Sequence, residues 1–190
     1  MNHSTSATHC ITFFAGGNAL TAFRARQLLG QVQKIAPGIR TIGARFVHWV
    51  SSAHALDADS ISKFRQLLTY GEAFQEESGA GVSIIVTPRM GTVSPWASKA
   101  TDIARNCGLT EAVGVQRIER GTQYFLHGAV LTETQRQAIE ALLHDRMTES
   151  VLTDIDAAAQ LFHHIQSETF SSVDVLGGGK EALVKANTEM

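Results

Sequence analysis

Residues Val86–Leu109 read VTPRMGTVSPWASKATDIARNCGL and carry the strongest structural signals of the chain. The stretch opens at the end of Val82–Thr87, an apolar and β-branched run that predicts a strand. Ser94 is a good helix N-cap, because its hydroxyl can accept a backbone N–H of the first turn, and Pro95 suits the first helical position. We therefore expect a strand, a short loop and a helix over Trp96–Cys107.

The start of this predicted helix collects hydrogen-bond donors and positive charge. The side chains concerned are Arg89, Thr92, Ser98 and Lys99. Free N–H groups and the helix dipole favour an anion at a helix N-terminus, which makes this a candidate binding site. The competing interpretation is a capped helix with solvated polar side chains, and the residues alone leave both open.

Strand and helix signals alternate along the rest of the chain. Further strands are predicted at Cys10–Ala15, Arg40–Val50 and Val115–Leu126. Further helices are predicted over Ala19–Ala36, from a cap at Asp57 or Asp59 to Gly71, and after a cap at Thr132. We expect a turn at Gly16-Gly17-Asn18 and a hairpin break at Arg120-Gly121. The order β-α-β-α thus occurs twice, over residues 10–71 and 82–145.

This element order predicts an α+β fold of two tandem β-α-β-α halves, with a mostly antiparallel sheet and helices packed on one face. A parallel α/β sheet is the alternative, because helices alternate with strands. Arg40–Val50 and Gln116–Leu126 mix polar with apolar residues, as half-exposed strands do. Parallel strands are usually continuous apolar runs, so the composition favours the antiparallel sheet.

The chain changes character after Asp145. Met147–Phe162 is predicted to be helical, and Gln166–Ser172 to be a loop. A glycine run then precedes a predicted helix over Lys180–Asn187, and the chain stops in that helix without a capping signal. We divide the chain into a first domain, residues 1–146, and a C-terminal helical segment, residues 147–190.

The missing capping signal leads us to expect a fragment of a longer protein. In such a fragment the apolar face of residues 147–162 would lack its partner. Exposed apolar surface drives association, so we expect self-association.

Composition narrows the classes of function. The chain has 16 Lys and Arg against 18 Asp and Glu, without the basic excess of a nucleic-acid-binding protein. No window approaches the ~18 apolar residues of a membrane span, and no secretory signal is present. Cys10 and Cys107 are expected to be free, buried thiols, and the histidines lack zinc-ligand spacing. We expect a cytoplasmic chain with no metal site and no nucleic-acid or membrane partner.

Four stretches resemble one family. Val86–Leu109 is very similar to the long signature in the N-terminal domain of the large, single-chain phosphoribosylformylglycinamidine synthase. The other three are RIERG at Arg117–Gly121, LHDRMTE at Leu143–Glu149 and SVDVLGGGKEAL at Ser172–Leu183. The resemblance covers nearly the whole chain, and its first motif is long enough to be highly specific.

The resemblance implies a role in de novo purine biosynthesis. The family's enzyme converts formylglycinamide ribonucleotide, glutamine and ATP to formylglycinamidine ribonucleotide. Its N-terminal domain resembles a fused dimer of the small PurS subunit, which agrees with the repeated element order. Residues 1–146 then correspond to the PurS-like domain and residues 147–190 to the beginning of the linker. The family's synthetase domain holds ATP and magnesium, and its glutaminase domain releases ammonia with a Cys-His-Glu triad.

The chain ends before the family's Ser-Glu-His-Cys-Arg-His motif, so the resemblance transfers no catalytic residue. It implies candidate docking or substrate-side contacts at Arg89, Thr92, Ser94, Trp96, Ser98 and Lys99. We expect a structural and assembly domain, inactive alone and without a cofactor of its own, whose partners are the synthetase and glutaminase domains. The alternative is an independent α+β module that binds a small anion at the Ser94 helix start.

Overall fold

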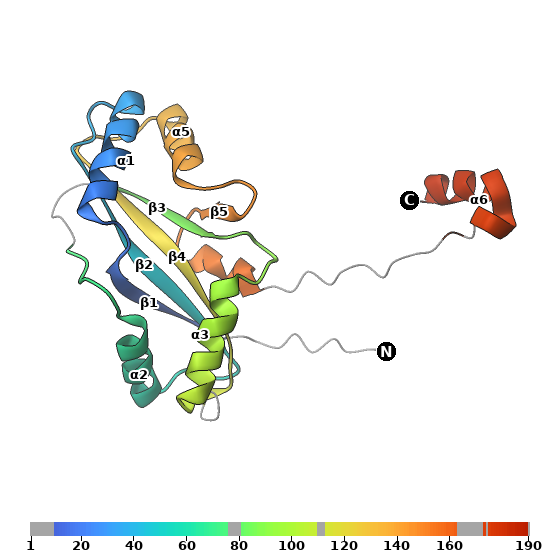
Figure 1. Ribbon diagram of the computed structural model, residues 1–190, viewed down its shortest axis with the longest axis horizontal. Coiled ribbons are helices and arrows are strands. Elements are labelled where there is room, and N and C mark those ends of the chain that lie inside the picture. The colour runs from blue at the N-terminus through green and yellow to red at the C-terminus, as the bar shows by residue number, and fades with distance from the viewer. Residues whose placement is uncertain (1–9, 76–80, 110–112, 163–172, 174, 190) are drawn as a thin grey trace.

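The computed structural model describes residues 10–75, 81–109, 113–162, 173 and 175–189 (Figure 1). Its strands are β1 (Cys10–Asn18), β2 (Thr41–Ser52), β3 (Gly81–Pro88), β4 (Val115–His127) and β5 (Glu149–Leu152). Its helices are α1 (Ala22–Ile35), α2 (Ala58–Leu68), α3 (Pro95–Asn106), α5 (Glu133–Leu143), the 3-10 helix η1 (Asp156–Phe162) and α6 (Val175–Glu189).

The strands form one sheet in the order β1-β2-β4-β3-β5, and every neighbouring pair is antiparallel. The central pair is β2 and β4, which run side by side from the Thr41–His127 pair to the Ser52–Val115 pair. β1 flanks this pair on one side and β3 on the other, so each β-α-β-α half supplies one central strand and one flanking strand. The antiparallel α+β prediction is confirmed, and the parallel alternative is wrong.

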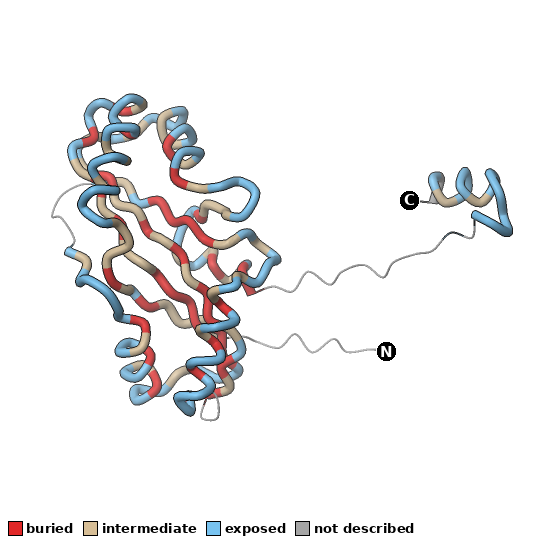
Figure 2. The backbone as a smooth tube through the Cα atoms, in the orientation of Figure 1, coloured by how far each residue is buried: buried red, intermediate tan, exposed pale blue. Residues whose placement is uncertain are grey.

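The four helices α1, α2, α3 and α5 cover one face of the sheet (Figures 1 and 2). At one end α1 and α5 bury Val32, Ile84, Leu126 and Ile139. At the other end α2 and α3 bury Phe14, Val50, Phe64, Ala104 and Ile118. Three of these helices, α2, α3 and α5, begin at predicted caps, because the side chains of Asp57, Ser94 and Thr132 each accept a backbone N–H of the first turn.

The second face of the sheet is partly covered by η1. The helix predicted over Met147–Phe162, the segment that contains η1, is wrong. The segment instead forms β5, which pairs with the outer edge of β3, and then η1. A free strand edge offers unpaired backbone groups, and pairing with it outweighs a weak helical periodicity. Leu152, Leu161 and Phe162 are buried against Trp49. These apolar side chains therefore have partners within the chain, whereas Met147 is 74% exposed. Self-association of the fragment stays a prediction.

Two turn predictions are also wrong. Arg120 and Gly121 lie in the middle of β4, which continues unbroken because β2 pairs with it along its whole length. Gly16 and Gly17 lie inside β1, at a register shift between Ala15 and Asn18. Both cysteines are free as expected, but Cys107 is exposed and Cys10 half-buried.

In the C-terminal region, α6 is interrupted at Gly179 (φ 57°, ψ −149°), which confirms the break predicted in the glycine run before Lys180–Asn187. The loop predicted at residues 166–172 lies outside the described residues, and the domain boundary after residue 146 stays a prediction. Within the part of the chain that the structure describes, no helix has both the length and the hydropathy needed to cross a membrane.

Gly121 provides a test of how tightly the sheet is packed. A Cβ at this position would lie 2.6 Å from the Val86 carbonyl oxygen and 2.9 Å from the Trp49 ring. We expect Gly121→Ala to lower the free energy of unfolding by about 1–3 kcal/mol, because the backbone and the indole must shift. Gly30→Ala is the control: its Cβ would meet nothing within 4 Å in the middle of α1, so it should stabilise by about 0.5–1 kcal/mol. Urea unfolding curves measure both, and equal effects would contradict the packing argument.

Candidate functional site

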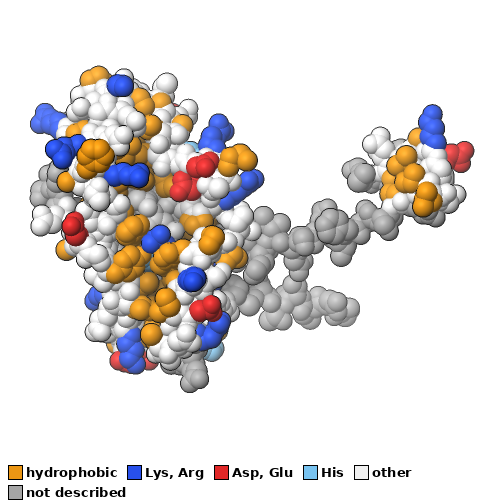
Figure 3. Space-filling model, in the orientation of Figure 1, with side chains coloured by type: hydrophobic (Ala, Val, Ile, Leu, Met, Phe, Trp, Pro, Cys, Tyr) orange, Lys and Arg blue, Asp and Glu red, His pale blue; other side chains and the backbone are white. Residues whose placement is uncertain are grey.

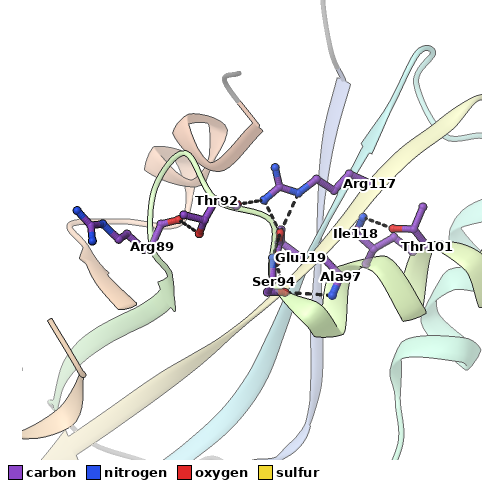
Figure 4. A network of polar contacts seen from close by, with 8 residues as sticks. All are labelled: Arg89, Thr92, Ser94, Ala97, Thr101, Arg117, Ile118 and Glu119. Atoms are coloured by element: carbon purple, nitrogen blue, oxygen red, sulfur yellow. Dashed lines mark hydrogen bonds and ion pairs between the residues drawn. The ribbon is translucent and has the colours of Figure 1, made fainter. Parts of the chain in front are cut away.

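A buried carboxylate organises the start of α3 (Figure 4). Glu119 is fully buried on β4, at a level where β3 no longer pairs, since the last β3–β4 pair is Val86 with Thr122. Its carboxylate accepts hydrogen bonds from Nε (2.8 Å) and Nη2 of Arg117 and from the Ser94 hydroxyl (2.9 Å). A buried charge needs such an ion pair and such hydrogen bonds, so these contacts are what keep Glu119 inside.

Ser94 connects this carboxylate to the helix. Its hydroxyl donates to Glu119 and accepts the backbone N–H of Ala97 at 3.0 Å, as the N-cap prediction requires. The Ser94 backbone N–H also points to Glu119, at 3.4 Å. The negative charge that a helix N-terminus attracts is therefore supplied by the chain itself. An external anion at the helix start would have to displace Glu119, which weakens the anion-binding alternative.

The loop before α3 is held by the same network. Arg117 donates through Nη2 to the Thr92 carbonyl oxygen, and the Thr92 hydroxyl donates to the Arg89 carbonyl oxygen at 2.6 Å. The Arg89 side chain donates to the carbonyl of Met147 at 3.4 Å. On the other side, the Arg117 guanidinium lies 5.4 Å from the centre of the Phe162 ring. Arg89 and Thr92 thus tie the loop to its surroundings.

A second cluster combines one cation with aromatic rings, on the helical face between the two ends of the sheet. The guanidinium of Arg120 lies 4.6 Å from the ring centre of Phe46 and 4.8 Å from that of Trp96, a cation–π arrangement on both sides. Arg120 also donates to the Tyr70 hydroxyl at 3.1 Å. The same hydroxyl lies 3.1 Å from Nε2 of His48.

His48 is fully buried beneath this cluster, with its ring 5.5 Å from that of Trp96. Burial, and after it the positive charge of Arg120, lowers the pKa of His48 from 6.5 to about 4. The imidazole is therefore neutral at neutral pH. Its Nε2 can then accept the proton of the Tyr70 hydroxyl, whose oxygen already accepts a hydrogen bond from Arg120.

An open cavity of about 260 Å³ lies beside Trp96 and Arg120. Polar or charged groups on its walls include Ser94, Thr122, Thr148 and Glu149, and Phe46 adds an aromatic wall. Of the predicted site residues, the structure places Ser94 and Trp96 here. Ser98 and Lys99 are exposed on α3.

Sequence reasoning missed the residues that hold this site together: Glu119, Arg120, His48 and Tyr70. Arg117, Glu119 and Arg120 all lie in the RIERG stretch, which was the available signal. Among the described residues, no group of three or more His, Cys, Asp or Glu side chains is placed to hold a metal ion.

The model of the formylglycinamide ribonucleotide (FGAR) amidotransferase N-terminal family matches residues 45–162, more than half of the chain. The chain belongs to this family. The match runs from β2 to the end of η1 and so includes Glu119, Arg120 and the cavity. The chain is thus part of the FGAR amidotransferase, the phosphoribosylformylglycinamidine synthase of purine biosynthesis, and other domains of that multidomain enzyme are its partners.

The buried ion pair makes a prediction for the stability of this FGAR amidotransferase domain. Glu119→Gln keeps the shape but leaves Arg117 without its counter-charge, so we expect a loss of about 3 kcal/mol in the free energy of unfolding. The matched control is Asp102→Asn on α3, which removes an exposed pair with Arg105 and should cost less than about 1 kcal/mol. Similar losses in the two variants, measured by chemical denaturation, would show that Glu119 is not structurally important.

His48 predicts how the stability of the domain depends on pH. Above pH 6.5 the histidine is neutral in both the folded and the unfolded chain and has no effect. As pH falls from 6.5 to about 4, only the unfolded chain takes up the proton, so His48 lowers stability by up to about 3 kcal/mol. His48→Gln should make the fall in unfolding free energy shallower over this range. The measurement is the unfolding free energy of the unsubstituted chain and of His48→Gln across this pH range, and two identical profiles would refute the assignment.

Proposed function

We propose that this chain is the structural and assembly domain of phosphoribosylformylglycinamidine synthase, which docks on the synthetase domain and is inactive alone. The parent enzyme makes formylglycinamidine ribonucleotide from FGAR, glutamine and ATP in the cytoplasm. In this proposal ATP and magnesium are held by the synthetase domain, and ammonia comes from the glutaminase domain. Family membership supports the assignment to the enzyme, and the surface of the helical face supports the docking role.

The observation that carries the docking role is an apolar groove between α2 and α3, of about 190 Å³. Its lining is mainly apolar and consists of Leu67, Leu68, Tyr70, Trp96, Lys99, Ala100 and Ile103. Figure 3 shows hydrophobic side chains gathered on this face of the molecule.

The helix α3 has apolar residues on two sides. Ala97 and Ala104 are buried against the sheet, whereas Ile103 is 50% exposed and Val93, just before the helix, is 52% exposed. A helix that packs on one neighbour only has a single apolar stripe, so the outward residues indicate a second contact. A partner domain in the same polypeptide is present at a high effective concentration, which allows a small groove to be covered permanently.

The predicted contact residues divide between two roles in this proposal. Ser98 and Lys99 lie on the exposed part of α3, and Lys99 lines the groove, so we assign these two to docking. Trp96 lines both the groove and the neighbouring cavity. Arg89, Thr92 and Ser94 are engaged in positioning the loop and the helix start, and so act on docking indirectly.

Complementation in trans tests the proposal. This chain is mixed with a synthase that lacks the corresponding N-terminal region, and the glutamine- and ATP-dependent formation of the amidine is assayed. We expect a complex that co-purifies and regains activity, whereas either part alone is inactive. Two well-folded parts that neither bind nor react together would overturn the docking role.

A pair of variants tests the groove itself. Ile103→Glu places a charge in the apolar groove, and we expect it to weaken association with the truncated synthase at least about tenfold, since burying an unpaired charge is costly. Val130→Glu is the control, at a position that is 93% exposed between β4 and α5. Circular dichroism establishes that both variants fold. Equal binding by the two variants would place the docking surface elsewhere.

A further inference from the structure

We propose that the cavity beside Trp96 binds a free α-amino acid, with its carboxylate at Arg120 and its ammonium group at Glu149. The cavity adjoins the docking groove, with which it shares Trp96, but the proposal does not depend on the docking role. It rests on two opposite charges that the fold holds at the two sides of one cavity.

The positive side of the cavity is a fixed guanidinium. Arg120 is clamped between the rings of Phe46 and Trp96, and both rings line the cavity. Its hydrogen bond to Tyr70 uses only one of five N–H donors. No carboxylate forms an ion pair with Arg120 among the described residues. A half-buried guanidinium with unused N–H donors and no ion-pair partner among the described residues can bind a carboxylate through two parallel hydrogen bonds.

The negative side lies on the edge strand. Glu149 pairs with Pro88 of β3, and the last residue pair between β3 and β4 is Val86 with Thr122, so the cavity lies where β3 has parted from β4, between Glu149 and Arg120. Glu149 lies two residues before Val151, which pairs with Val86 and packs in the core on the helical face, so strand alternation places the Glu149 side chain on that same face. Glu149 accepts a backbone N–H from Asp145 at 2.8 Å, and no cation pairs with it among the described residues.

The size and rim of the cavity select the ligand class. Its volume of about 260 Å³ is below the roughly 300–1,000 Å³ of sites for drug-sized ligands, so a nucleotide is too large. A simple anion would meet the charge of Glu149, and a simple cation that of Arg120. A small zwitterion satisfies both charges at once. The hydroxyl groups of Ser94, Thr122 and Thr148 on the rim favour a polar side chain, as in glutamine or serine.

Calorimetric titration of the 190-residue chain with L-glutamine and with L-serine tests the proposal. N-acetyl-L-glutamine and N-acetyl-L-serine are the matched ligands, because acetylation removes the ammonium charge and leaves the carboxylate and the side chain in place. We expect saturable binding of at least one amino acid, at least about tenfold weaker for its N-acetyl form, and a change in tryptophan fluorescence from Trp96. Absence of saturable binding at millimolar concentrations, or equal binding of the acetylated form, would overturn the proposal.

Variants locate the site. Arg120→Gln and Glu149→Gln should each weaken binding of the amino acid at least about tenfold, since each removes a charged hydrogen-bond partner. Lys34→Gln removes an exposed charge in the last turn of α1 that does not line this cavity, so it should change the affinity less than about twofold. Glu149→Gln alters the edge strand only, so it tests the site even where Arg120→Gln disturbs the packing of Trp96. Unchanged binding in Glu149→Gln would overturn the proposal. Amino-acid binding is measured on this chain alone. Its outcome is therefore independent of the complementation experiment that tests the docking role.

Discussion

A carboxylate without access to water constrains the architecture around it. The buried carboxylate of Glu119 needs the charge of Arg117 and the hydrogen bond of Ser94, and these two groups come from different elements. The requirement therefore fixes the start of α3 relative to β4, and through Thr92 it fixes the loop that leads there. Along the same helix the hydroxyl of Thr101 accepts the backbone N–H of Ile118, at a level where β3 no longer pairs with β4. Side chains of α3 thus replace a missing strand along one edge of β4.

The parts of the fold that could be predicted from the sequence are those with local causes. Asp57, Ser94 and Thr132 cap their helices through atoms only three residues away, and the alternation of polar and apolar residues in β2 and β4 distinguishes an antiparallel sheet from a parallel one. The errors have distant causes. β5 exists because the edge of β3 is free, and a local pattern carries no information about that edge. Gly121 resembled a turn residue, but it is a glycine because Trp49 and the Val86 carbonyl approach it closely.

The candidate site shows the same division. The helix start at Ser94 was predictable because an N-cap is a short pattern. Glu119 was not, because a glutamate in an alternating strand looks like any solvated position, and only the arrival of Arg117 and α3 makes it a buried one. The cluster around Arg120 likewise assembles residues from β2, β4, α3 and the segment after α2. Its chemistry exists only in the folded chain, and this is why the motif stretch alone indicated a family but not a geometry.

The pairing of β2 with β4 has a consequence for how the protein is made. The ribosome releases Thr41–Ser52 long before Val115–His127, so the inner edge of β2 waits without its neighbour while the second half is synthesised. Ladders between such distant segments form slowly, and an unpaired edge in the meantime can capture another nascent chain. β5 and η1 are synthesised later still, and until then Trp49 and Ile85 lack their packing partners Leu152, Leu161 and Phe162 on the second face. Until residues 115–127 are synthesised, the inner edge of β2 is therefore the part of the growing domain that is most open to such capture.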